Sequence, residues 1–142
     1  MPLSAASETP YFENQAGRLF YNPAGYVRLN WAPGRLPLDV IQAFYEQVLA
    51  LLLRTNARRI LSEHGQRAPI PPAAQDWLTH DWIPRAMQLA RTRHCAIVEG
   101  ADPVHRLSTQ AVVSTAPTDF HFQRFPTLAE ADAWLRNLQL PG

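Results

Sequence analysis

Residues 26–31 alternate apolar and polar side chains, which is the period of a half-buried strand. A shorter run, residues 19–21, reads as a first strand, and the Asn-Pro-Ala-Gly turn between the two runs favours a hairpin. In the second run, Val27, Leu29 and Trp31 point to one side and the polar residues between them to the other. The pattern therefore predicts a β-hairpin in which one face of the second strand is buried.

A helical period replaces the alternation in the next segment. Apolar residues recur every three or four positions across residues 38–53, as in an amphipathic helix. The apolar face is so wide that we expect it to be covered on more than one side, by a neighbouring helix or by a second subunit. Asn56 is expected to end this helix in the left-handed conformation.

The rest of the chain alternates short apolar strands with helices. Pro84 would clash inside a helix, so we expect the helix that begins near residue 73 to stop at His80 and to restart with Asp81 as its cap. Asp102 and Pro103 open the next helix. The predicted strands are 58–62, 94–99 and 118–124, and the helices are 73–80, 81–92, one from 103 with Val104, Leu107 and Ala111 on its apolar face, and one from 127.

Strands that alternate with helices are typical of a largely parallel sheet with helices packed on it. We therefore predict a single α/β domain over residues 11–142. Its sheet is mixed and mostly parallel, with about five strands, an N-terminal β-hairpin and four main helices. Residues 1–10 are small and polar, and we expect them to form a loose segment. Residues 11–15 are either a short strand or an extended lead-in.

Composition excludes several classes of function. Hydrophobic residues make up 46% of the chain and charged residues 18%, as in a globular domain. The 13 basic and 12 acidic residues give a net charge of +1, which leaves no electrostatic footprint for nucleic acid. Every basic residue is an arginine, so the chain has no lysine for a Schiff base or a P-loop.

The sequence also carries no targeting signal that we can identify. We find neither a signal peptide nor an apolar run of about 18 residues that could span a membrane. The single cysteine, Cys95, lies in an apolar run, so we interpret it as a small buried residue rather than a nucleophile. These features predict a cytoplasmic protein.

Polar residues gather where two of the predicted strands end. The carboxyl ends of neighbouring parallel strands meet at one edge of a sheet, and ligands usually bind there. We predict a candidate ligand-binding crevice at this edge, in which an arginine could clamp an anion. The alternative is a set of ordinary polar loop ends with no ligand. The candidate residues are Glu63, His64, Arg67, Glu99 and Asp102.

Motifs for catalysis and metal binding are not visible in the sequence. The histidines are spread over separate elements without a metal-binding spacing, so we expect no metal and no cofactor. A catalytic set of Ser62, His64 and Glu63 can be written down, but neighbouring residues on one turn rarely converge. We therefore predict no catalytic residue.

The tryptophans of the helical segment 73–92 allow two interpretations. Trp77 and Trp82 are five residues apart, so they need not both face the core. They either pack in the core or between helices, or form a partner-binding surface together with Tyr45. The partner would be another protein or a second copy of this chain.

Several segments from residue 12 onward carry a resemblance to a known fold. They are Asn30-Trp31 at the end of the hairpin, the long helix to Leu53, Arg59-Ile60-Leu61 with its polar turn, Trp77, Trp82-Ile83-Pro84-Arg85, Ala96-Ile97-Val98 and the closing segment 125–135. Together with the order of elements, they resemble the STAS-like fold of bacterial anti-sigma-factor antagonists. Within that fold, the chain resembles a set of uncharacterised bacterial single-domain proteins of about this length. The resemblance implies the same α/β architecture.

One departure from the antagonists concerns their regulatory serine. The antagonists carry a phosphorylated serine in a turn after the strand that corresponds to residues 58–62, whereas this chain reads Ser62-Glu63-His64-Gly65 there. We therefore do not transfer the phosphorylation switch. We interpret the protein as a non-enzymatic binding or regulatory module that acts through protein–protein contacts or a small apolar ligand. The alternative is a small-molecule enzyme built around His64, Arg67 and Glu99, with His64 as the base.

Overall fold

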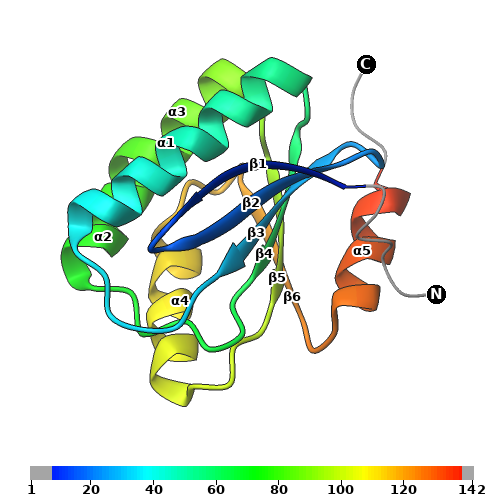
Figure 1. Ribbon diagram of the computed structural model, residues 1–142. Helices are drawn as coiled ribbons and strands as arrows, with labels where there is room; N and C mark the ends of the chain where they lie inside the picture. The colour runs from blue at the N-terminus through cyan, green and yellow to red at the C-terminus, as the bar shows by residue number, and fades with distance from the viewer. Residues whose placement is uncertain (1–7, 139–142) are drawn as a thin grey trace.

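The computed structural model describes residues 8–138 and contains one six-stranded sheet with helices on both faces (Figure 1). The strands follow one another across the sheet in chain order. The first three pair in antiparallel fashion and the last four in parallel fashion, so that β3 belongs to both halves. The strands are β1 (Thr9–Asn14), β2 (Gly17–Asn22), β3 (Tyr26–Trp31), β4 (Arg59–Glu63), β5 (His94–Val98) and β6 (His121–Phe125).

The predicted α/β class and mostly parallel sheet are confirmed, but the sheet has six strands where about five were predicted. The sixth is β1, which pairs with β2 and has a register shift between Pro10 and Phe12. That irregularity removes the clean alternation by which the strand would have been recognised. Thr9 and Pro10 already belong to β1, so the predicted loose segment overlaps the sheet at its end, while residues 1–7 lie outside the described part.

The parallel strands carry their connecting helices on one face of the sheet. Each crossover connects neighbouring strands in the same direction, and right-handed crossovers then place every helix on the same side. The last helix follows β6, makes no crossover, and covers the opposite face (Figure 1). The helices are α1 (Leu38–Thr55), α2 (Pro72–Trp77), the π-helical segment η2 (Leu78–Trp82), α3 (Ile83–Ala90), α4 (Pro103–Thr115) and α5 (Leu128–Asn137).

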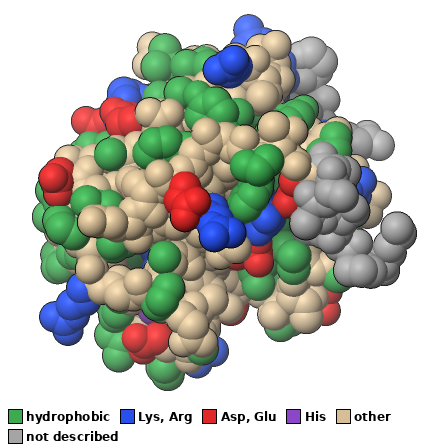
Figure 2. All heavy atoms as spheres, in the orientation of Figure 1, with side chains coloured by type: hydrophobic (Ala, Val, Ile, Leu, Met, Phe, Trp, Pro, Cys, Tyr) green, Lys and Arg blue, Asp and Glu red, His purple; other side chains and the backbone are tan. Residues whose placement is uncertain are grey.

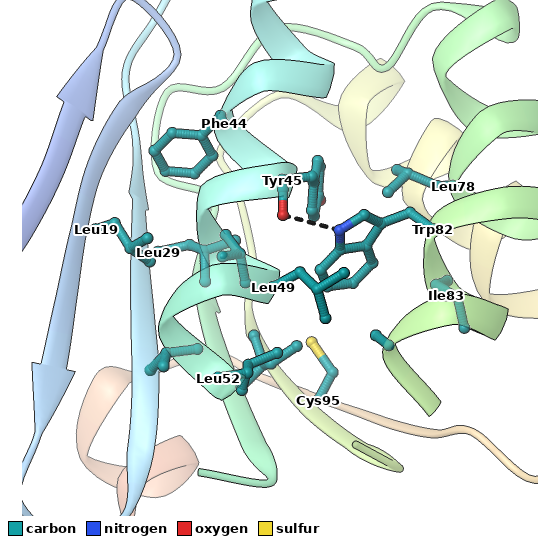
Figure 3. Close-up of a cluster of buried hydrophobic side chains, with 14 of the residues drawn as sticks. Leu19, Leu29, Phe44, Tyr45, Leu49, Leu52, Leu78, Trp82, Ile83 and Cys95 are labelled. Atoms are coloured by element: carbon teal, nitrogen blue, oxygen red, sulfur yellow. Dashed lines mark hydrogen bonds between the residues drawn. The ribbon is translucent and has the colours of Figure 1, made fainter. Parts of the chain in front are cut away.

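The main core lies between the sheet and the helices α1, α3 and η2. Figure 3 shows Leu19 and Leu29 of the sheet facing α1, and Trp82 packed beside Tyr45 on its other side. The wide apolar face of α1 is thus explained by two neighbours: it packs on β1, β2 and β3 and also on α2 and α3. Asn56 ends the helix with φ of 58°, as predicted.

Contrary to the prediction, Pro84 does not interrupt the second helix. The helix runs on from α2 through η2 into α3, and Asp81 caps nothing; its carboxylate accepts a hydrogen bond from Arg85 Nε at 2.7 Å. A π-turn widens the helix by one residue, so the carbonyl that a proline ring would otherwise strike is displaced. The predicted restart at Asp81 was therefore wrong, because a π-turn accommodates proline without a break.

A smaller core lies under α5, on the other face of the sheet. Ala131 and Leu135 of this helix pack against Tyr26, Leu61 and Ala96. The alternation predicted for residues 26–31 is confirmed, because Tyr26 faces α5 while Val27 and Leu29 face the main core. The predicted half-burial is wrong, because Tyr26 and Arg28 on the second face are buried as well.

The surface shown in Figure 2 carries acidic and basic side chains interspersed with apolar and other polar ones, without a broad area of one sign. This distribution agrees with the near-zero net charge of the sequence. None of the helices in residues 8–138 is long and apolar enough to cross a bilayer.

Candidate functional site

The structure brings two of the five predicted crevice residues together and separates the other three. His64 and Arg67 turn inward and are almost fully buried. Glu63 lies on the opposite face of the sheet, in an ion pair with Arg28. Successive residues of a strand point to opposite faces, so Glu63 cannot share a pocket with its neighbour His64.

Glu99 and Asp102 stay at the carboxyl end of the sheet but are occupied with other partners. Glu99 forms an ion pair with Arg124 of β6. The Asp102 carboxylate accepts a hydrogen bond from the backbone N–H of Val104 at 2.9 Å, which confirms its predicted role as the cap of α4. Neither carboxylate lines the cavity described below.

The inward-facing residues belong to a polar cluster enclosed between β3, β4 and α4. None of its members is more than 4% exposed. It contains residues that the sequence did not single out together, because they come from four separate parts of the chain. The polar cluster consists of Trp31, Ser62, His64, Arg67, His105 and Thr109.

A tight turn after β4 places His64 and Arg67 in the polar cluster. The His64 N–H donates to the carbonyl of Val98 at 3.1 Å, extending the ladder between β4 and β5 by one residue. The Arg67 N–H then donates back to the His64 carbonyl at 2.8 Å, with Gly65 between them at φ of 52°. A glycine adopts this left-handed conformation without strain.

Short hydrogen bonds connect the polar cluster from end to end. Trp31 Nε1 lies 2.9 Å from Ser62 Oγ, and Ser62 Oγ lies 3.1 Å from His64 Nε2. His64 Nδ1 lies 2.9 Å from His105 Nε2, and His105 Nδ1 lies 3.0 Å from the carbonyl oxygen of Ala68. Ser62 and His64, whose convergence was considered unfavourable from the sequence, are therefore in direct contact.

Arg67 is a buried cation without an acidic partner among residues 8–138. Its Cζ lies 3.4 Å from the centroid of the Trp31 ring, and its charge also interacts with the Tyr45 hydroxyl. Burial lowers the pKa of Arg67 from its usual range. Because a guanidinium stays charged in proteins, the interior of the domain holds a positive charge.

A cavity of about 50 Å³ adjoins the polar cluster. One end of it is polar, and most of the wall is apolar. At about 10–15 Å³ for each water molecule, the cavity has room for roughly four. The polar end is formed by Ser62, His64, Arg67 and Thr109, and the apolar wall includes Leu29, Ile70, Leu78, Trp82, Ile97 and Phe122.

Burial keeps the two histidines and the cysteine around this cavity neutral. It lowers the pKa of His64 well below its usual 6.5, and the nearby charge of Arg67 adds to the effect. The pKa of His105 is lowered to about 4 for the same two reasons. Burial raises the pKa of Cys95 to about 12, so its thiol is protonated and unreactive, in line with its expected place in the core.

The aromatic residues considered for partner binding lie mainly inside the molecule. Trp82 is 2% exposed and Tyr45 is 9% exposed. The Trp82 indole donates a hydrogen bond to the Tyr45 carbonyl at 2.8 Å (Figure 3). Trp77 is half-buried and packs edge-on against the Tyr45 ring. Two of these three side chains therefore serve the core, and only Trp77 reaches solvent.

The sequence prediction for α4 was wrong, and this explains why His105 and Thr109 were missed. Val104 and Leu107 were assigned to the buried face but are 59% and 71% exposed. The buried face instead carries the polar residues at helical spacing, His105, Ser108 and Thr109. A run of hydroxyl and imidazole groups on one helix face was the available signal. It was overlooked because buried faces are expected to be apolar.

Comparison with known proteins identified no relative. A scan against family models, a search of curated proteins and a search of solved structures each found no match to this chain. The resemblance to the STAS-like fold therefore stays a prediction. Within residues 8–138, no group of three or more histidine, cysteine and carboxylate side chains is arranged to hold a metal ion.

Proposed function

We propose that this domain is a non-enzymatic binding module for a small organic anion, a carboxylate with a short apolar body, held in the cavity beside Arg67. The observation that carries the proposal is the buried guanidinium of Arg67, which has no carboxylate partner among the described residues. The ligand's carboxylate would supply the missing negative charge. Its apolar part would lie against the apolar wall of the cavity.

The free energy needed to bury the charged Arg67 side chain supports an anionic ligand. Removing an ion from water costs several kcal/mol, even after the surrounding protein relaxes. Stacking on Trp31 returns about 2 kcal/mol, and the Tyr45 hydroxyl offers one further interaction. These contacts leave part of the cost uncompensated, and a carboxylate that binds the guanidinium through two hydrogen bonds would offset it.

The volume of the cavity and its apolar wall limit the size and polarity of the ligand. Space for roughly four water molecules corresponds to about four or five non-hydrogen atoms. The apolar wall disfavours a second charged or strongly hydrated group on the ligand. Short monocarboxylates such as acetate and propionate meet both conditions.

The alternative predicted from the sequence, an enzyme using His64, Arg67 and Glu99 in one crevice, receives less support. Glu99 is paired with Arg124 and does not line the cavity. A protein-binding surface built on Tyr45, Trp77 and Trp82 is disfavoured as well, because Tyr45 and Trp82 are buried and only Trp77 is partly accessible to a partner.

Isothermal titration calorimetry with propionate tests the proposal. Propionamide, which has nearly the same size and shape but no charge, is the matched control ligand. We expect saturable 1:1 binding of propionate and none of propionamide. The variant Arg67→Met keeps an apolar side chain over Trp31 and should lose propionate binding by at least about tenfold, since one charge-assisted contact contributes about 1.5–3 kcal/mol.

Two results would contradict the proposal. The first is a folded wild-type protein that binds neither acetate nor propionate at millimolar concentration. The second is equal affinity for propionate and propionamide, which would mean that the apolar wall binds the ligand without the guanidinium.

A further inference from the structure

The hydrogen-bond chain of the polar cluster has a fixed direction, because each of its ends can play only one role. The Trp31 indole N–H only donates, and the Ala68 carbonyl only accepts. His105 must therefore carry its proton on Nδ1, and its Nε2 then accepts from His64 Nδ1. His64 Nε2 is left without a proton and accepts the hydrogen bond of the Ser62 hydroxyl.

This direction makes His64 the proton acceptor of the cavity. A proton added at His64 Nε2 would turn that nitrogen into a donor toward Ser62 Oγ. The Ser62 hydroxyl would then have to point its own hydrogen elsewhere, and Trp31 offers it only another donor. In the ligand-free protein, protonation would thus direct the Ser62 hydroxyl hydrogen into the cavity, where it needs an acceptor, and set an imidazolium near Arg67.

A carboxylate in the cavity would remove both obstacles. Ser62, His64 and Arg67 line the same small space, so one carboxylate can contact all three. Its oxygens can accept the hydrogen of the Ser62 hydroxyl, and its charge balances the imidazolium and the guanidinium.

We propose that the cavity takes up its carboxylate together with one proton, which binds at His64 Nε2. This inference rests on the proposed function and adds that carboxylate binding is coupled to the uptake of one proton. The ligand class is accordingly that of a short weak acid, taken up as an anion and a proton. Affinity for the anion then increases as the pH falls.

The charges around His64 agree with this linkage. Arg67, His105 and Arg124 disfavour a proton on His64 in the ligand-free protein. Glu99 and Asp102 act in the opposite direction on His105, but Glu99 is already paired with Arg124. The other side chains hydrogen-bonded to the two rings, Ser62 and Thr109, carry no charge. The electrostatic potential at His64 is therefore positive in the ligand-free protein, and a bound anion would lower it.

Calorimetry of wild-type protein with propionate, in PIPES and in imidazole buffer, measures the proton directly. These buffers differ in ionisation enthalpy, so the difference in observed heat gives the number of protons taken up. We expect about one proton per propionate near neutral pH. We also expect the dissociation constant to increase by about tenfold per pH unit between about pH 6 and about pH 8, where the ligand itself stays ionised.

The position of the proton is tested in two ways. Two-bond ¹⁵N–¹H correlation spectra of the wild-type imidazoles should show His64 protonated on Nδ1 alone in the free protein and on both nitrogens with propionate. The variant His64→Gln, which cannot titrate, should bind propionate with no proton uptake and no pH dependence. If that variant does not fold, the wild-type spectra decide the assignment.

The outcomes separate this inference from the proposed function. Propionate binding without proton uptake overturns the inference and leaves the binding proposal intact. Uptake that persists in a folded His64→Gln variant, or spectra in which His64 stays neutral, overturns the assignment to His64. No propionate binding in folded wild-type protein overturns both.

Discussion

Two buried arginines occupy opposite electrostatic settings in this domain. The Arg28 guanidinium, on the α5 face of the sheet, lies 2.9 Å from Glu8 and also pairs with Glu63. Arg67, on the other face, stacks on Trp31 and has no acidic partner among the described residues. Both are at most 9% exposed, so solvent screens neither. The pair thus offers a matched comparison at the level of single residues.

Replacing each arginine with methionine should have unequal effects on the free energy of unfolding. Arg28→Met leaves a buried carboxylate, Glu8, and a half-buried one, Glu63, without a cation and should cost about 3–5 kcal/mol. Arg67→Met removes a charge whose desolvation cost is only partly compensated, so it should leave the free energy of unfolding of the ligand-free protein unchanged or raise it by about 1 kcal/mol. Urea denaturation measures both. An Arg67→Met variant as unstable as Arg28→Met would mean that Arg67 is already compensated in the free protein.

The sequence predicted part of the site at this scale. Arg67 as an anion clamp and His64 beside it followed from their position after a parallel strand, and the structure brings these two together at the cavity. Glu63, Glu99 and Asp102 carried the same positional signal. None of the three reaches the cavity: Glu63 points to the opposite face of the sheet, Glu99 pairs with Arg124, and Asp102 caps α4. The direction of Glu63 can be predicted from the alternation of side chains along a strand. The pairing of Glu99 cannot, because it depends on a residue of the neighbouring strand.

The continuous helix α2–η2–α3 shows how one irregular element positions a core residue. The π-turn accommodates Pro84 and directs Trp82 toward α1, where its indole donates to the Tyr45 carbonyl. Trp77, five residues earlier, remains at the edge of the core. The helix therefore contains one fully buried and one half-buried tryptophan.

Phenylalanine substitutions should distinguish the two tryptophans. Trp82→Phe removes a buried indole and its hydrogen bond, and we expect a loss of about 2 kcal/mol in the free energy of unfolding. Trp77→Phe keeps an aromatic ring at a partly solvated site and should cost less than about 1 kcal/mol. Guanidinium denaturation followed by circular dichroism provides the measurement, with Trp77→Phe as the control. A larger loss for Trp77→Phe would contradict the assignment of Trp82 as the core residue.

The whole molecule should lose stability in mild acid because it buries neutral histidines. In the unfolded chain, histidines take up protons near pH 6.5, whereas in the folded protein the pKa of His105 is about 4 and that of His64 is also lowered. Between these values the unfolded state binds more protons. The contribution of these neutral histidines to the free energy of unfolding is therefore complete above about pH 6.5 and is lost as the pH falls toward about 4.

Urea denaturation at a series of pH values tests this expectation. The variant His105→Gln should flatten the decrease, because it removes one of the histidines that remain neutral in the folded state. Ser108→Ala is the matched control on the same helix face, since it deletes a buried polar group that does not titrate in this range. If His105→Gln keeps the full pH dependence, the acid sensitivity arises elsewhere in the molecule.

The sequence by itself determined the α/β class, the hairpin, the mostly parallel sheet and the positions of the principal helices. These features depend on period and on local turn and cap chemistry, which neighbouring residues carry. It did not determine β1, whose bulge breaks the period. It also did not determine the π-turn at Leu78–Trp82, because Pro84, which follows this turn in α3, reads as a helix break.

Only the tertiary structure decided which side of α4 is buried and which polar groups meet. His105 is 41 residues from His64 along the chain, and Trp31 is 31 residues from Ser62. No local pattern reports contacts over such separations. In the sequence, a buried polar face of a helix cannot be told from an exposed one, because the same types of residue occur on both. The hydrogen-bond chain, the uncompensated charge of Arg67 and the cavity between them exist only once the strands and α4 are packed together.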